Sequence, residues 1–292
     1  MATKLFAPAD LTNQGPVRRP LPFGLFSVLA FSTPMSAHWQ AGGLTWDYFT
    51  SDTIDSVGAP SGEVDSDGRY GRPETGLPKR FAAEVESGAP EMPAVGTATP
   101  FSVYGYAKES AAMASQESLE NDALEHLAAF EEAQVSRHLW HGDVKNFPFL
   151  TYTETDPAKQ PSIHEPEDLG AGTHRVAVAT LEEWIADTYG SLGVMYASRK
   201  TGLLAIADKA LEVKGGVLQT RLGTPVVLSH EFDDDEIRVS PALMGYRSEP
   251  FTSSKPGNPN VNIRNNDIYA IAERTYLLGF DPTGIATMAI NG

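Results

Sequence analysis

The pattern of apolar and polar positions is clearest early in the second hundred residues, where it predicts one long helix over 112–141. Apolar side chains recur there at three- and four-residue steps in two adjacent lines, which together form one broad apolar face. Carboxylates crowd the first turns, and Arg137, His138 and His141 occupy the last ones, which suits the dipole of a helix. Gly142 follows as a left-handed stop. The two apolar lines are Leu119, Ala123, Leu127 and Phe130, and Leu124, Ala128, Val135 and Leu139.

Before this helix, the chain has the pattern of an arm followed by a polar segment. Residues 1–50 contain five prolines and many large apolar side chains, so we expect an extended arm that lies against a body, its own or a neighbour's. An ordinary N-terminal strand and loop packed on the same domain is the alternative. Residues 51–105 are rich in Gly, Pro, Ser, Asp and Glu, and strand-like pieces at 62–70 and 79–85 predict a polar hairpin. Four cations lie near its centre: Arg69, Arg72, Lys79 and Arg80.

After the helix, strand and helix patterns are interleaved without a regular βαβ period, which predicts an α+β fold. Residues 146–172 are proline-rich and predict a loop. The stretch from Thr180 to Glu183 has the form of a capping box and predicts a helix from there to Tyr189. The remaining predicted elements are strands at 193–198, around 226–228, at 237–246, at 267–280 and at 285–290, and a helix at 203–213.

Composition narrows the class of protein. The chain has 292 residues, of which 41% are hydrophobic, so a sizeable core is expected. The formal net charge of −16 disfavours a free-standing nucleic-acid-binding protein, which needs a basic surface. The absence of cysteine excludes disulfides, thiol nucleophiles and zinc–thiolate sites. Arg18 and Arg19 precede an apolar run at 21–31 in the outline of a twin-arginine export signal, but Pro22 and Gly24 interrupt the run and disfavour it.

The chain carries no recognisable catalytic motif, because it has no G-x-S-x-G, Walker, G-x-G-x-x-G or H-E-x-x-H pattern. His138 and His141 are three residues apart and could share a metal, but their place at a helix end favours capping or packing. The acidic run 233–236 lacks the spacing of an EF-hand loop and favours a solvated turn. We therefore expect no catalytic residue, no cofactor and no metal site, and a protein that is not an enzyme.

Two stretches resemble the major capsid proteins of tailed bacteriophages, whose Hong Kong ninety-seven fold is shared with encapsulins. The first is the G-x-P-V-V segment, and the second is that family's closing segment, in which a Glu-Arg pair on a long strand is followed by a proline and a final strand. The order of arm, polar hairpin, long helix and α+β body also resembles the family plan over nearly the whole chain. The residues that carry the resemblance are Gly223, Pro225, Val226, Val227, Glu273, Arg274 and Pro282.

The resemblance implies a domain organisation and a structural function. It implies an N-terminal arm at 1–50, an E-loop at 51–105, a peripheral domain at 106–171 and 246–282 with the spine helix at 112–141, and an axial domain at 172–245 and 283–292. It further implies a subunit that assembles in the bacterial host cytoplasm into the icosahedral head shell around the double-stranded DNA of a tailed phage. The implied partners are other copies in hexamers and pentamers, portal and scaffolding proteins, decoration proteins, and DNA bound on the inner face without sequence specificity, with no membrane. Any scaffold is expected to be a separate protein.

Two alternatives remain open, an encapsulin-like bacterial compartment shell and a soluble enzyme or binding protein with an unrecognised site. The Pro-rich arm favours the phage interpretation over the encapsulin. For the shell, we expect the four cations of 51–105 to lie across an acidic helix of a neighbouring copy. The acidic residues of that predicted contact are Glu117, Glu120, Glu125, Glu131 and Glu132. A cross-link between Lys79 and the asparagine-rich loop 258–266 is conceivable, but no distinctive motif favours it.

Overall fold

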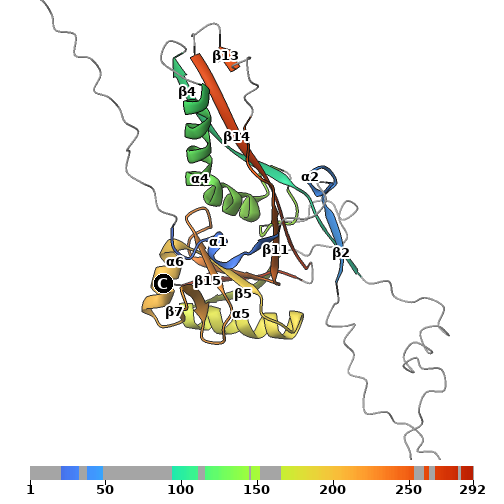
Figure 1. Cartoon of the computed structure of the whole chain (residues 1–292). Helices are drawn as coiled ribbons and strands as arrows, with labels where there is room; N and C mark the ends of the chain where they lie inside the picture. Colours follow the sequence, from blue (N-terminus) through green and yellow to red (C-terminus); the bar gives the residue numbers. More distant parts are fainter. Residues whose placement is uncertain are drawn as a thin grey trace, which may run out of the picture.

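Two β-sheets, a long helix and two shorter helices make up most of the part of the chain that the structure describes (Figure 1). The computed structural model describes residues 21–32, 38–48, 94–110, 116–144, 146–151, 166–252, 260–262, 267–281 and 284–291. The predicted hairpin pieces at 62–70 and 79–85, with the four cations, lie outside the described residues, as do Pro282 and residues 253–259. Mixed helices and strands confirm the α+β prediction.

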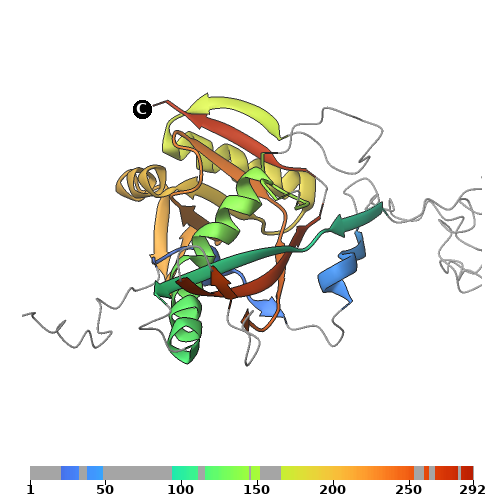
Figure 2. The same ribbon diagram turned by 90° about the horizontal axis from the view of Figure 1, so that it is seen from above.

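The first sheet is built around β14, Asp267–Phe280, which has the bounds that its alternating pattern predicts. This long strand pairs antiparallel with β4, Phe101–Ser110, and the two lie side by side in Figures 1 and 2. A strand of this length holds several short partners because each needs only a few ladder hydrogen bonds. These partners are β11, Leu243–Arg247, β12, Phe251–Thr252, and β13, Asn260–Asn262, while β1, Phe31–Ser32, adds to β11 in parallel.

The long helix α4, Gln116–His141, packs against β4 and β14 (Figure 1). The predicted residues 112–115 lie outside the described part of the chain. Gly142 has φ +67°, and its N–H donates to the carbonyl oxygen of His138, so the predicted stop is confirmed. Ala128 is exposed, because the face that meets the sheet is narrower than the predicted one. The residues of the two predicted lines that are buried are Leu119, Ala123, Leu127, Val135 and Leu139.

The second sheet has five strands in the order β5-β15-β10-β6-β9, with parallel outer pairs and antiparallel central ones. Helices α5, His174–Tyr189, and α6, Arg199–Ala207, cover one face, because Met195 and Ala197 point toward them. Val194 and Tyr196 point to the other face and join the core of the first sheet. The strands are β5, Glu167–Gly172, β15, Ala286–Ile290, β10, Glu236–Ser240, β6, Val194–Ser198, and β9, Val226–Ser229, and the hairpin β7, Leu211–Lys214, with β8, Val217–Thr220, lies beside α6.

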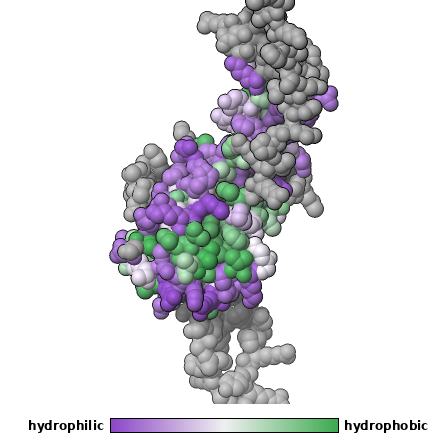
Figure 3. All heavy atoms as spheres, turned by 90° about the vertical axis from the view of Figure 1, so that its left-hand side faces the viewer, coloured by the Kyte–Doolittle hydropathy of each residue, from purple (hydrophilic) through white to green (hydrophobic). Residues whose placement is uncertain are grey.

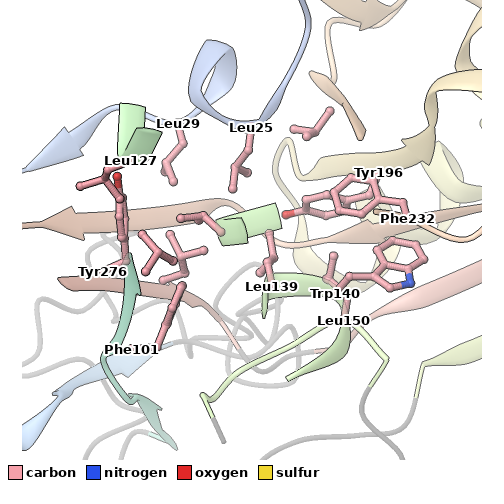
Figure 4. Packing of buried hydrophobic residues seen from close by; sticks show 14 of the residues in the cluster. Leu25, Leu29, Phe101, Leu127, Leu139, Trp140, Leu150, Tyr196, Phe232 and Tyr276 are labelled. Atoms are coloured by element: carbon pink, nitrogen blue, oxygen red, sulfur yellow. The ribbon is translucent and has the colours of Figure 1, made fainter. Parts of the chain in front are cut away.

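The described part of the N-terminal arm lies against its own chain. Leu25, in the short helix α1, Leu25–Val28, and Leu29 are both buried in the main core (Figure 4). Phe23 is hydrogen-bonded through its carbonyl oxygen to the N–H of Leu228, 2.8 Å away, which ties the arm to β9. Further on, the short helix α2, Trp39–Gly42, is followed by β2, Leu44–Tyr48, which pairs with β3, Ala94–Ala98.

Four predicted elements differ from the structure for physical reasons. The single strand predicted at 237–246 is two strands, because β10 pairs in the second sheet and β11 pairs with β14 in the first. The predicted helix start at Thr180 is wrong, because helix α5 already begins at His174 and Thr180 lies inside it. The preceding strand β5 begins seven residues before His174. The predicted helix at 203–213 is wrong in its second half, because Lys209 has φ +59° and Leu211 pairs with Thr220 as a strand. The predicted loop at 146–172 ends in β5, which forms by parallel pairing with β15.

Candidate assembly surfaces

Glu131, at the middle of α4, is used inside the chain. Arg274 of β14 places its Nη1 atom 2.8 Å from Glu131 Oε2 and 3.2 Å from Oε1, and the Tyr276 hydroxyl donates to Oε2 at 3.0 Å. The paired side chains are only 18% and 12% exposed. A buried carboxylate held by an arginine and a tyrosine is satisfied and has little capacity left for a neighbour. Glu131 is therefore an anchor between helix and sheet within the chain.

Glu132 has a similar internal role on the adjacent side of the helix. Its Oε1 atom accepts from the backbone N–H of Phe26 at 2.9 Å, which fixes α1 against α4. Burial raises the pKa of this carboxyl, and the hydrogen bond from Phe26 partly opposes that shift. Of the five predicted acidic residues, Glu117 and Glu125 are exposed and Glu120 is half-buried. We call these three carboxylates the acidic face of α4.

The Glu273–Arg274 pair of the sequence resemblance is divided between the two faces of β14. Because successive side chains of a strand alternate, Arg274 points to Glu131 while Glu273 is exposed on the other face. On that exposed face, Glu273 lies opposite Tyr104 of β4 and Phe251 of β12. Four large aromatic side chains are exposed on these strands, which the sequence analysis did not identify, although the alternation in β4 was the available signal. Their exposed fractions are Tyr104 59%, Tyr106 58%, Phe251 64% and Tyr269 38%.

Side chains of α4 cover the middle of the free edge of β4. Gln134 accepts from the Tyr104 N–H at 3.3 Å and donates to the Tyr104 carbonyl oxygen at 3.1 Å, and His126 accepts from the Tyr106 N–H at 3.4 Å. An unpaired strand edge is a template for pairing with another chain. These contacts occupy the outward backbone groups of Tyr104 and the N–H of Tyr106, while the Tyr104 and Tyr106 side chains stay exposed.

The G-x-P-V-V segment forms a half-buried turn that leads into the buried strand β9. Gly223 has φ +103°, a conformation that favours glycine. The carbonyl oxygen of Pro225 accepts from the N–H of Met195 at 2.9 Å, and Val226 and Val227 are buried. The turn is held from α5 by Glu182, whose buried carboxylate accepts hydrogen bonds from the hydroxyls of Thr220 and Thr224. In the sequence, Glu182 belonged to the capping-box pattern, so this clamp was not foreseen.

The C-terminal end of α4 joins the first sheet to the second. Trp140 donates from Nε1 to Asp233 at 3.0 Å, and its ring stacks on Phe232 with centroids 4.6 Å apart. The Arg238 guanidinium lies 4.7 Å from the centroid of the Trp140 ring and also donates to the carbonyl oxygen of Leu150. Figure 4 shows Trp140, Phe232 and Tyr196 grouped at one end of the core. The two sheets are therefore joined by packed aromatic rings and a nearly buried arginine.

The two histidines near the end of α4 differ in their surroundings. The His138 ring packs edge-on against Phe101, with centroids 5.3 Å apart, and burial lowers its pKa. His141 is exposed. Within the described ranges, no group of three or more His, Asp or Glu side chains is arranged to hold a metal ion. None of the helices in these ranges combines the length and the hydropathy that a bilayer crossing requires.

Known structures share this arrangement along nearly the whole chain. The capsid of the native GTA particle, in a structure computed with C5 symmetry, is 12% identical in sequence, covers 94% of this chain and 93% of its own, and has a TM-score of 0.53. The capsid of the empty GTA particle is also 12% identical, covers 94% of this chain and all of its own length (100%), and has a TM-score of 0.52. A structure from Gordonia phage Cozz is 13% identical over 98% and 92% of the two chains, with a TM-score of 0.48.

No protein-family model and no curated protein matches the sequence. The likeness to solved structures is therefore one of fold. The chain has the fold of a capsid subunit, the Hong Kong ninety-seven fold that the sequence resemblance implied.

Proposed function

We propose that this chain is the structural subunit of a closed protein shell, the icosahedral head of a tailed phage that encloses double-stranded DNA. The observation that carries the proposal is the likeness to the GTA particle capsid, which extends over almost the full length of both chains. A subunit of a closed shell buries surface against several copies of itself, and the exposed aromatic face of β4, β12 and β14 is surface of that kind. The role is structural and not catalytic.

The partners in this proposal are other copies arranged as hexamers and pentamers, with portal and scaffolding proteins during assembly and decoration proteins on the finished shell. Packaged DNA lies against the inner face without base-specific contacts. The net charge of −16 supports this weak association, because an acidic surface limits adhesion to phosphates. Assembly takes place in the host cytoplasm and the product is the virion capsid. The division into N-terminal arm, E-loop, peripheral domain and axial domain belongs to the same proposal.

Purified protein examined by negative-stain electron microscopy tests the proposal directly. We expect hollow icosahedral particles, and nuclease-protected double-stranded DNA in particles taken from infected or induced cells. Particles that contain protein cargo and no DNA would favour the encapsulin-like compartment instead. A monomer in light scattering at every concentration, with no particles, would overturn the shell function and direct attention to a soluble enzyme or binding protein.

Within the shell, we place the acidic face of α4 under the four cations of 51–105 from a neighbouring copy. The support is charge: Glu117 and Glu125 are exposed in the structure, and the four cations stand out in an acidic chain. Each exposed pair contributes only about 0–1 kcal/mol, so the contact is a salt-sensitive network. Reversing Arg69, Arg72, Lys79 and Arg80 to Glu is expected to reduce assembly and leave the unfolding temperature of the free subunit unchanged. Normal assembly of that variant would contradict this contact.

A further inference from the structure

The segment 22–32 runs from the second sheet to the first. At its start, the carbonyl oxygen of Pro22 accepts from Arg199 Nη1 of α6 at 3.0 Å. The next carbonyl oxygen, that of Phe23, accepts from the N–H of Leu228 in β9 at 2.8 Å. At its end, β1 pairs with β11 of the first sheet. We call residues 22–32 the clasp, because they join the two sheets.

Two leucines anchor the clasp in the core that the sheets share. Leu25 is 0% and Leu29 is 6% exposed, and Figure 4 shows both side chains pointing into the cluster that holds Leu127 of α4 and Tyr196 of β6. The clasp has little structure of its own, because α1 has four residues and β1 has two. So short a helix is not stable in isolation. A segment with few anchors opens locally while the rest of a fold stays closed.

The closed clasp carries backbone strain at Phe23, which has φ +63°. This left-handed conformation is unfavourable for a residue other than glycine and persists only where the surroundings hold it. Here the hydrogen bond from Leu228 holds it. Opening the clasp releases this strain, so the strain favours the open state.

The carboxylate of Glu132 lies directly over the clasp. Its Oε1 atom accepts from the Phe26 N–H at 2.9 Å, and a Cβ added at the buried Gly24 would lie 2.6 Å from the Glu132 Cδ. Burial raises the pKa of Glu132, while the hydrogen bond from Phe26 and the charge of Arg199 oppose that shift and the charge of Glu131 adds to it.

Glu132 is the group through which pH acts on this contact. The clasp itself has no titratable side chain, since residues 22–32 are Pro, Phe, Gly, Leu, Ser, Val and Ala. The charges that act on Glu132 are Arg199 of α6 and its neighbour Glu131, which is paired with Arg274 of β14.

We propose that the clasp opens and closes while both sheets stay folded, and that Glu132 makes this opening depend on pH. Opening returns the carboxylate to water, where its pKa falls back toward 4.5. The closed state therefore holds the Glu132 proton more tightly. Closure is strongest below pH 4.5 and weakens as the pH rises through the closed-state pKa.

The clasp and the aromatic packing at the end of α4 both join the two sheets. Opening the clasp therefore loosens the subunit at one of its joints without unfolding it. This inference goes beyond the proposed shell function, because it concerns the free subunit and holds whether or not the chain assembles.

Introduced thiols measure the opening, because the chain has no cysteine of its own. Leu25→Cys places a thiol on the clasp, and Leu181→Cys places an equally buried one on α5, in the core of the second sheet. Leu203→Cys is the open reference, because Leu203 is 66% exposed on α6. Figure 3 shows a contiguous hydrophobic area on the side of the molecule where α6 lies in Figure 1.

Unassembled subunits are labelled with dithiodipyridine, and each rate is divided by that of free cysteine at the same pH. We expect Leu25→Cys to react about tenfold or more faster than Leu181→Cys, and more slowly than Leu203→Cys. Equal rates for Leu25→Cys and Leu181→Cys would overturn the local opening, because the clasp would then open only when the whole chain unfolds.

Hydrogen exchange of the unchanged chain gives a second measurement, since Leu25→Cys itself shortens an anchor. The Leu228 N–H donates to Phe23 in the clasp, whereas the Met195 N–H donates to Pro225 within the second sheet. After correction for intrinsic rates, we expect the Leu228 N–H to exchange about tenfold or more faster. Equal protection of the two N–H groups would count against the clasp.

The pH dependence tests the role of Glu132. From pH 4.5 to neutral pH, the rate of Leu25→Cys relative to Leu181→Cys should rise by up to about tenfold for each pH unit and then level off. Adding Glu132→Gln should abolish this rise, because glutamine keeps the acceptor for Phe26 and has no charge. A rise that persists in Glu132→Gln, or a rate that falls with pH, would show that Glu132 is not the group responsible.

A glycine pair tests the contact itself. Gly24→Ala drives the Glu132 carboxylate away from the Phe26 N–H and is expected to raise the labelling rate of Leu25→Cys by roughly tenfold. Gly42→Ala is the matched control, because nothing lies within 4 Å of its added Cβ, and the rate should not change. If Gly24→Ala and Gly42→Ala label at the same rate, Glu132 does not hold the clasp closed.

Discussion

Replacing Gly105 by alanine tests how closely α4 is seated on β4. An added Cβ would lie 2.3 Å from the backbone nitrogen of Leu127, 2.6 Å from the carbonyl oxygen of Ala123 and 2.8 Å from the Leu127 Cα. All three atoms belong to the helix backbone, so no side-chain rotation relieves the clash. Ordinary contact begins at about 3.5 Å, so helix and strand must separate by roughly 1 Å. Overpacking costs about 1–3 kcal/mol, and two rigid backbones place this change near the upper limit.

Urea unfolding of the unassembled subunit, followed by tryptophan fluorescence, measures the loss. Against a total stability of about 5–15 kcal/mol, a loss near 3 kcal/mol shifts the midpoint clearly. Gly42→Ala is the matched control, because nothing lies within 4 Å of its added Cβ, and its expected effect is within about 0.5 kcal/mol. If Gly105→Ala unfolds at the same urea concentration as the control, the close approach of α4 and β4 is refuted.

Three further predictions concern buried charges. Arg274→Met leaves the Glu131 carboxylate with Tyr276 as its one partner and is expected to lower the free energy of unfolding in urea by about 2–3 kcal/mol. Adding Glu131→Leu is expected to recover part of that loss. If the losses of the two single variants simply add, the interaction between Arg274 and Glu131 is contradicted. Burial lowers the pKa of His138 below 6.5. The neutral side chain therefore stabilises the fold above pH 6.5, and this contribution is lost as the pH falls from 6.5 toward the pKa of the folded state. Over that pH interval, the unfolding temperature of His138→Phe should decline less than that of the unchanged chain. Burial raises the pKa of Glu132 above 4.5. Its contribution to stability is therefore present below pH 4.5 and is lost as the pH rises through the pKa of the folded state. Glu132→Gln should be no less stable than the unchanged chain at neutral pH, and a marked loss of stability there would contradict the raised pKa.

The long elements were predictable from the sequence because many residues repeat one signal. Alternation over 267–280 gave β14 its bounds, and the periodic apolar residues with Gly142 gave the end of α4. Short strands carry no such repeat. β5 forms because it pairs with β15, more than 110 residues further along the chain, and such pairing leaves no local pattern. β7 is different, because it pairs with β8 across Gly215 and Gly216, and this two-residue glycine turn is a local hairpin signal that the sequence analysis missed.

The capping box at Thr180 shows how tertiary packing overrides a local signal. The pattern of a hydroxyl residue followed by glutamate is typical of a helix start. The apolar residues Ala177, Leu181 and Ile185 are all buried against the second sheet, and extending the helix back to His174 keeps them on one face. Burial of that stripe stabilises the longer helix more than a cap stabilises the shorter one.

The sequence also could not divide the carboxylates of α4 between inside and outside. Adjacent helix positions differ by about 100°, and the arginine that selects Glu131 lies 143 residues further along the chain. The G-x-P-V-V segment was singled out by its resemblance to the capsid-protein family, whereas its clamp, Glu182, lies 38 residues from Thr220 and is brought there only by the fold.

This division of α4 separates folding from assembly and can be measured. The second half of the helix anchors the fold through Glu131 and Glu132, while the first half exposes Glu117 and Glu125. Glu131→Gln is therefore expected to lower the unfolding temperature of the free subunit, since it leaves the nearly buried Arg274 without its counter-charge. Reversing Glu117 and Glu125 to Lys is expected to leave that temperature unchanged and to reduce particle formation in a salt-dependent way. If both variants changed folding and assembly together, the acidic face would be part of the anchor and not a surface for a neighbour.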